Sequence, residues 1–144
     1  AIVRLSPADY HRFHFPAAGR VLDQWDVDGA VDSVHPIALA AGVRVFAHNW
    51  RRVAMLHLTC PGRCGFVEVG AFGVAGIVHT HAGTEFRKMD EKGYFRFGGS
   101  SLVLAFERGA VLFSEDLLRY SAEGIETRVK TGETVGRTNQ QEEP

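Results

Sequence analysis

Two glycines and two serines interrupt a stretch that otherwise suits a β-strand, "YFRFGGSSLVLAFERG", which runs from Tyr94 to Gly109. Because Gly98 and Gly99 have no Cβ, their backbone adopts conformations that other residues avoid, and the Gly99 carbonyl is open to approach. The hydroxyl of Ser100 follows directly and can attack that carbonyl once a base has taken its proton. The four residues are therefore typical of a peptide bond open to intramolecular attack, and also of a plain β-turn.

Two histidines near the start of the chain are candidates for the base that such an attack requires. His11 and His14 lie in the segment "SPADYHRFHFPAAG", and histidine takes up and releases protons near neutral pH. Side chains three residues apart leave an extended strand on opposite faces, whereas a turn can bring them together. The Pro16–Gly19 stretch favours a turning path, so we predict that both histidines line the same cavity. The alternative is that they pack or are exposed, with no chemical role.

The composition is that of a single domain with a balanced charge. Of the 144 residues, 45% are hydrophobic, and the formal net charge is -1, so we expect about one domain with an ordinary core. No face rich in lysine or arginine indicates a nucleic-acid partner. The apolar stretches end before the ~20 residues that a membrane-spanning helix needs.

The two cysteines, Cys60 and Cys64, flank a Pro-Gly turn in "CPGRC". We interpret them as two thiols at the tip of a hairpin, and a disulfide between them stays open as the alternative. A metal site would need partners such as His57, His79 or His81, and their spacing matches no zinc signature. We therefore expect no metal site.

Short apolar segments rich in Val, Ile and Phe predict β-strands along most of the chain, with Gly, Pro and Asn between them. The segment "SEDLLRYS" predicts a short helix over 114–120 with Ser114 as its N-cap. We predict a mainly β fold, an antiparallel β-sandwich or distorted barrel with one or two short helices. It forms a single domain over residues 1–136, followed by a polar tail over 137–144. The predicted strands cover 43–48, 53–59, 65–81 and 101–107.

A series of motifs extends over nearly the whole chain. They are "YHRFH", "SVHPIAL", "VFAHNWRRV" with an Asn-x-Arg pattern at Asn49 and Arg51, "VEVGAFGVAGI", "KGYFRFGGSS" and "GIETRVKTGETVG". In this order they resemble the motifs of the phosphatidylserine decarboxylase family. Several motifs in the right order are far more specific than any one of them alone.

The resemblance implies that the chain cuts itself between Gly99 and Ser100. Ser100 would attack the Gly99 carbonyl, and residues 1–99 and 100–144 would become the two chains of the enzyme. Ser100 would be converted to a pyruvoyl group, the cofactor, which acts as an electron sink while phosphatidylserine loses carbon dioxide to give phosphatidylethanolamine. By motif position His14 corresponds to the histidine of the family's self-cleaving triad. We expect His11 to serve mainly decarboxylation, as a proton donor.

The chain also departs from the family's pattern. Its motif is Gly-Ser-Ser, where Gly-Ser-Thr is more usual. The family's triad Asp precedes the Y-H-R-x-H segment, so we expect it to lie outside residues 1–144. We expect the same of the helices that contact the membrane. We do not assign the role of the triad Asp to Asp9.

The partners and location implied by the resemblance are those of an enzyme acting on a lipid. We expect a phospholipid substrate at a membrane surface, either the bacterial cytoplasmic membrane or an organelle membrane such as the mitochondrial inner membrane. A homodimer is left open. Two other functions also remain: a pyruvoyl-dependent decarboxylase of a free aromatic amino acid, and a β domain that neither cleaves nor catalyses.

Overall fold

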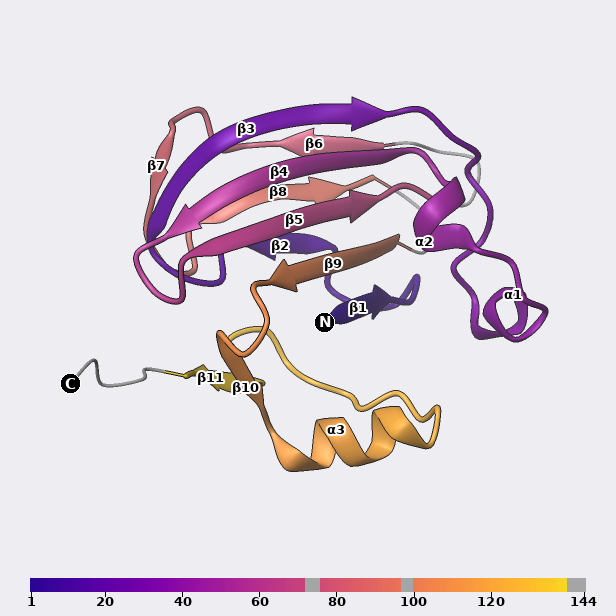
Figure 1. Ribbon diagram of the computed structural model, residues 1–144. Helices are drawn as coiled ribbons and strands as arrows, with labels where there is room; N and C mark the ends of the chain where they lie inside the picture. The colour runs from indigo at the N-terminus through magenta and orange to yellow at the C-terminus, as the bar shows by residue number, and fades with distance from the viewer. Residues whose placement is uncertain (72–75, 97–99, 140–144) are drawn as a thin grey trace.

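The computed structural model describes residues 1–71, 76–96 and 100–139 of the chain. Its largest element is a curled antiparallel sheet of six strands, seen from one side in Figure 1. In spatial order the strands are β1 (Ile2–Leu5), β9 (Ser100–Phe106), β5 (Arg63–Val69), β4 (Arg51–Leu58), β3 (Gly19–Val27) and β7 (Glu85–Phe86).

A second sheet lies behind the first in Figure 1 and consists of β2 (Arg12–His14), β8 (Glu91–Phe95) and β6 (Ile77–His79). Alternate side chains of a strand face opposite sides, and the inward side chains of both sheets form one buried core. Its fully buried members include Phe13, Phe15, Ala54, Leu56, Leu58, Cys64 and Phe66. This half-barrel of antiparallel strands confirms the predicted mainly β fold.

The predicted strands at 53–59 and 101–107 correspond to β4 and β9, and the stretch 65–81 contains most of β5 and all of β6. The strand predicted over 43–48 is wrong, because Val45–His48 forms the short helix α2. Its backbone groups bond within the segment, as in the donation from Asn49 N to Val45 O, and Val45 packs with Val34 and Ala71. A short apolar run does not distinguish a strand from a buried helical turn, so packing decides.

Two other helices are described, α1 (Pro36–Ala40) and α3 (Glu115–Ala122), so there are three short helices where one or two were predicted. Ser114 occupies the N-cap position of α3 as predicted, although no cap hydrogen bond from its side chain is found among the described residues. After α3, β11 (Gly136–Thr138) pairs with β10 (Val111–Phe113). The segment expected as a polar tail from residue 137 therefore begins inside a strand.

Asn49 joins three segments beside the end of β5. It is fully buried, and its Nδ2 donates to Asp32 O at 2.8 Å and to Gly70 O at 2.7 Å, while its Oδ1 accepts from Asp32 N at 3.2 Å. Gly70 directly follows β5, whose last residue, Val69, lies opposite Ser101 on β9. The amide of Asn49 therefore holds the end of the sheet at which β9 begins.

Replacing Asn49 with alanine should lower the free energy of unfolding by about 2 to 4 kcal/mol, because buried backbone groups would lose their partners. Asn49→Asp should cost at least as much, since a carboxylate oxygen would then face two carbonyl oxygens. Urea denaturation measures both changes, with Gln24→Ala as the control because Gln24 is an exposed amide. Equal stability of the three variants would show that Asn49 is not a structural tie.

Candidate active site

Ser100 is the first residue of β9, and its side chain faces the interior between the two sheets. It is 2% exposed and lies opposite Leu5 on β1. Leu5, Leu102 and Leu104 pack on the core, and alternate residues of a strand share a face. Ser100 therefore points inward with Leu102 and Leu104.

Ser101 points to the opposite side of β9, where it lies across from Arg4 and Val69. Its Oγ is buried and has no hydrogen-bond partner among the described residues. The two adjacent hydroxyls are thus separated by the sheet, and Ser100 is the one that shares the interior with the histidine described next.

His11 supplies the nearest base to the Ser100 hydroxyl. Its Nδ1 lies 3.2 Å from Ser100 Oγ, and its Nε2 lies 3.0 Å from the carbonyl oxygen of Ser6. Because a carbonyl only accepts hydrogen bonds, Nε2 must carry the ring proton of a neutral imidazole. Nδ1 then presents its lone pair, and the Ser100 hydroxyl donates to it. This is the geometry of a nucleophile with its general base.

A tight turn holds the Ser6 carbonyl in place. Asp9 N donates to Ser6 O at 2.9 Å, and Ser6 N donates to Asp9 Oδ2 at 2.7 Å. The hydrogen bonds from Ser6 lower the pKa of Asp9, so its carboxylate stays ionised. Asp9 thus acts on His11 only through the Ser6 carbonyl. The sequence analysis did not identify this link, although Ser-Pro-Ala-Asp is a typical turn sequence that indicates it.

His14 lies on the other face of β2, so the prediction that both histidines line one cavity is wrong for the described structure. Phe13 and Phe15 are buried in the core, which turns the side chain between them away from it. The His14 ring stacks on Tyr10, with ring centroids 5.9 Å apart. The segment stays extended because β2 pairs with β8 as far as His14, and the chain bends only afterwards. The catalytic roles predicted for the two histidines are not tested by these contacts.

Gly98 and Gly99, with the bond predicted to be cut, lie outside the described residues. No group of three or more His, Cys, Asp or Glu side chains that could hold a metal ion occurs in the described parts of the chain. Cys64 is buried, and this burial raises the pKa of its thiol to about 11. No helix within the described ranges is long and apolar enough to cross a membrane.

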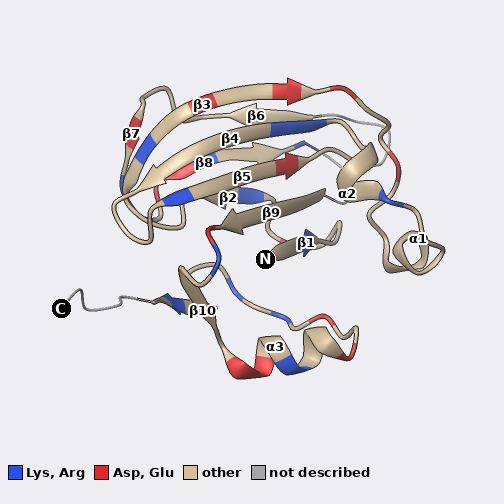
Figure 2. Ribbon diagram, viewed as in Figure 1, with Lys and Arg blue, Asp and Glu red and all other residues tan. Residues whose placement is uncertain are grey.

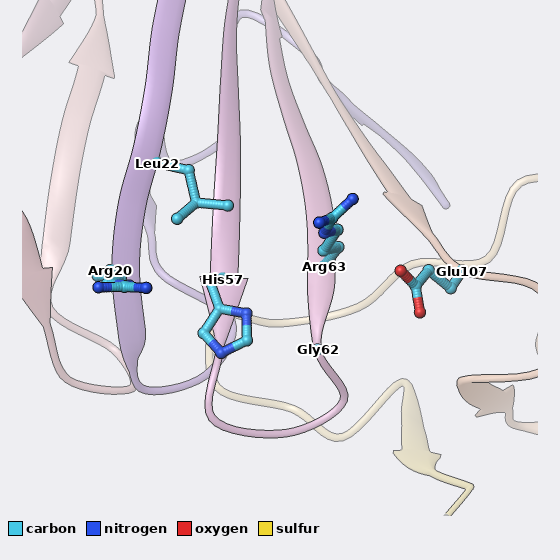
Figure 3. Close-up of a pocket in the computed structure, with 6 residues that line it drawn as sticks. All are labelled: Arg20, Leu22, His57, Gly62, Arg63 and Glu107. Carbon is cyan, nitrogen blue, oxygen red and sulfur yellow. The ribbon is translucent and has the colours of Figure 1, made fainter.

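A concave surface lies on the outer face of the large sheet, away from Ser100. Arg20, His57 and Arg63 stand side by side on β3, β4 and β5, with Glu107 beyond the end of β9 (Figure 3). The neighbours Leu58 and Cys64 point into the core, so these side chains point outward. The residues that line this surface include two arginines and no nucleophile–base pair like the one formed by Ser100 and His11.

Comparisons with known proteins show which family the chain belongs to. The family model for phosphatidylserine decarboxylase matches residues 1–137. The phosphatidylserine decarboxylase proenzyme of Chlamydia muridarum (strain MoPn / Nigg) is 42% identical over 138 residues, which are 95% of this chain and 46% of the relative. That of Fusobacterium nucleatum subsp. nucleatum is 40% identical over 136 residues, 94% of this chain and 45% of the relative.

The chain spans about half the length of the curated relatives that it matches. No solved structure matches it. Since the family model extends over almost all of the sequence, including both histidines and Ser100, the chain belongs to the phosphatidylserine decarboxylase family.

Proposed function

We propose that this chain is the self-cleaving, catalytic part of a pyruvoyl-dependent phosphatidylserine decarboxylase. It would cut the bond between Gly99 and Ser100 and convert phosphatidylserine to phosphatidylethanolamine and carbon dioxide. The contact of 3.2 Å between His11 Nδ1 and Ser100 Oγ carries the proposal. The name of the relatives, which are proenzymes of this decarboxylase, supports it.

In the cleavage step His11 Nδ1 takes the proton of the Ser100 hydroxyl, and Oγ attacks the Gly99 carbonyl carbon. The carbon–nitrogen bond breaks, the nitrogen of residue 100 takes up a proton, and an ester replaces the amide. Loss of the Cα proton of residue 100 then expels residues 1–99 as a carboxylate. The dehydroalanine that remains reacts with water and releases ammonia, which leaves a pyruvoyl group at the start of the second chain.

The surroundings of Ser100 fit a group formed there. The side chain is 2% exposed, and β9 is paired with β1 on one side and β5 on the other. A pyruvoyl group at this position would supply the electron sink for decarboxylation, and the strands on both sides of β9 would hold it and shield it from water. His11 remains in reach of residue 100 to hold or deliver a proton. This extends the role predicted for His11 to both reactions, and leaves His14 as the alternative base.

Cleavage would not separate the two chains. β9 belongs to residues 100–144, whereas both of its neighbours belong to residues 1–99 (Figure 1). Backbone hydrogen bonds on both edges of β9 would therefore keep the products together as one folded unit. We further propose that the enzyme meets its phospholipid at a membrane surface, because the acyl chains of that substrate reside in a bilayer.

Ser100→Ala should abolish cleavage and leave one uncut chain, because no hydroxyl then faces the interior. Ser101→Ala is the matched control, and it should still cut at the same bond because Ser101 faces the other side of β9. Each protein is expressed from its whole gene and analysed by mass spectrometry. A chain that begins with a pyruvoyl group should appear for the wild type and Ser101→Ala but not for Ser100→Ala. If Ser101→Ala blocked cleavage and Ser100→Ala did not, the nucleophile would be assigned one residue too early.

His11→Ala should slow cleavage by about 10²- to 10⁴-fold, the usual contribution of a general base. The His14→Ala variant should cleave much faster than the His11→Ala variant, because His14 stacks on Tyr10 on the other face of β2. The rate is followed on denaturing gels after synthesis of the chain, and added imidazole should partly restore the His11 variant. If the His14 variant cleaved slowly and the His11 variant cleaved at the wild-type rate, His14 would be the base.

The substrate is tested by comparing carbon dioxide release from phosphatidylserine vesicles and from free tryptophan. We expect turnover of the lipid and little or none of the amino acid. The reverse preference would identify a soluble amino-acid decarboxylase. A wild-type protein that stays uncut and inactive on both would exclude the proposed function altogether.

A further inference from the structure

A lysine and a glutamate form an ion pair inside the core, close to the reactive serine. Glu68 on β5 is 0% exposed and Lys92 on β8 is 2% exposed, and Lys92 Nζ donates to Glu68 Oε1 at 2.5 Å. The ammonium also lies over the ring of Phe66, 5.3 Å from its centroid. Burying both charges is expensive, and apolar residues of similar volume would stabilise the fold as well or better. The pair is therefore a candidate for a functional role.

The backbone is irregular at the point that supplies the lysine. Phe13 on β2 lies opposite Gly93, but the next residue, His14, lies opposite Glu91. Lys92 is thus an extra residue between two paired ones, which is a β-bulge. Bulges redirect a side chain and are frequent beside active sites. Here the bulge lets Lys92 enter the core, whereas its neighbour Glu91 forms a surface ion pair with Arg12.

Of the two carboxylate oxygens of Glu68, one has no hydrogen-bond donor among the described residues. Glu68 Oε1 accepts from Lys92, but Oε2 is buried without a hydrogen-bond partner among the described residues. The Nε2 atom of His79 lies 3.4 Å away, an ion-pair distance only if the imidazole is protonated. A buried carboxylate oxygen left without a donor is destabilising, because it has given up its hydrogen bonds to water. A buried acceptor without a donor calls for an explanation, and a ligand that supplies the missing hydrogen bond is one.

The same register places this oxygen near residue 100. Glu68 lies directly opposite Leu102 on β9, and Ser100 precedes Leu102 by two residues on the same face. Diagonal neighbours of this kind are about 7 to 8 Å apart between their Cα atoms. At this separation one ligand of a few atoms can contact both the Glu68 carboxylate and residue 100.

The two charged residues that precede Glu68 in this row of the sheet, Asp26 and Arg52, are paired with each other. Acidic and basic segments alternate across β3, β4 and β5 in Figure 2. Asp26 on β3 and Arg52 on β4 hold each other through two hydrogen bonds of 2.6 and 2.8 Å. Glu68, beside Arg52 on β5, is therefore the described carboxylate in this row that keeps an acceptor available.

We propose that Glu68 Oε2 binds the ammonium group of the amino-acid headgroup and holds it beside residue 100, and that Lys92 orients this carboxylate through its hydrogen bond to Oε1. An anionic acceptor selects a primary ammonium and repels a carboxylate or a phosphate. Glu68 is then a specificity-determining residue for the amine end of the substrate. The inference rests on the proposed function, from which it takes the amine-bearing headgroup.

The test compares two short-chain, water-soluble lipids that differ in the amine. Dihexanoyl phosphatidylethanolamine carries the ammonium group, and dihexanoyl phosphatidylglycerol lacks it. The pyruvoyl ketone of the cleaved protein is first reduced with borohydride, so that the amine cannot condense with it. Calorimetric titration of this protein, expressed from its whole gene, should show tighter binding of the amine-bearing lipid. In Glu68→Gln the affinity for phosphatidylethanolamine should fall by about tenfold, the size of one hydrogen bond to a charged group. The affinity for phosphatidylglycerol should not change.

Glu107→Gln is the matched control, because Glu107 is exposed at the opposite end of β9. It should bind both lipids as the wild type does. Glu68→Gln leaves the buried ammonium of Lys92 without its charged partner, and this variant can fail to fold. The double variant Glu68→Gln/Lys92→Met removes both charges and is tested in the same way. Both variants should still cleave before Ser100, since His11 remains, and cleavage is read by mass independently of decarboxylation.

A cleaved double variant that keeps the preference of the wild type for the amine would overturn the role of Glu68. So would a cleaved wild-type protein that binds both lipids equally. A wild-type protein that is never cleaved overturns the proposed function instead, and the two failures are therefore distinguishable.

Discussion

The pairing of β9 between β1 and β5 is the constraint on which the rest of the site depends. A strand bonded on both edges cannot rotate, so each of its side chains is committed to one face of the sheet. This commitment turns Ser100 toward the interior and Ser101 away from it, although the two residues are chemically alike and adjacent. It also places the proposed reaction at the junction of a rigid strand and the glycines before it. Rigid support of this kind is what a reactive group needs if its geometry is to be maintained.

The environment of His11 shows how backbone groups can take over the task of a carboxylate. In a serine–histidine–aspartate triad the carboxylate selects the tautomer of the imidazole and stabilises its protonated form. In this structure the Ser6 carbonyl makes the hydrogen bond to Nε2 and so selects the tautomer. A neutral carbonyl stabilises a protonated ring less than a carboxylate does. The Asp9 carboxylate reaches the ring only through the turn that it closes with Ser6.

The core contains charge where a purely structural sheet would contain hydrocarbon. Burial lowers the pKa of Lys92, while the attraction of Glu68 opposes that shift. Neither charge is cheap to bury, and the β-bulge that admits Lys92 interrupts an otherwise regular pairing. Aromatic rings on both sheets surround the ammonium group, which strengthens its interaction with the carboxylate because water is excluded. The interior of the half-barrel thus contains a charged pair, Glu68 and Lys92, surrounded by apolar side chains.

The sequence by itself determined the class of the fold, because alternating Val, Ile and Phe between glycine-rich turns is compatible with few structures other than antiparallel sheets. It also predicted the junction at which we propose cleavage, since a glycine pair followed by serine is a local feature, and the motif order was sufficient to identify the family. The positions of α2 and Lys92 required the tertiary structure, because a four-residue helical turn and a one-residue bulge leave no distinct periodicity. The choice between His11 and His14 also required it. Both lie in one motif, and only the pairing of β2 with β8 decides which imidazole faces Ser100 and which faces Tyr10.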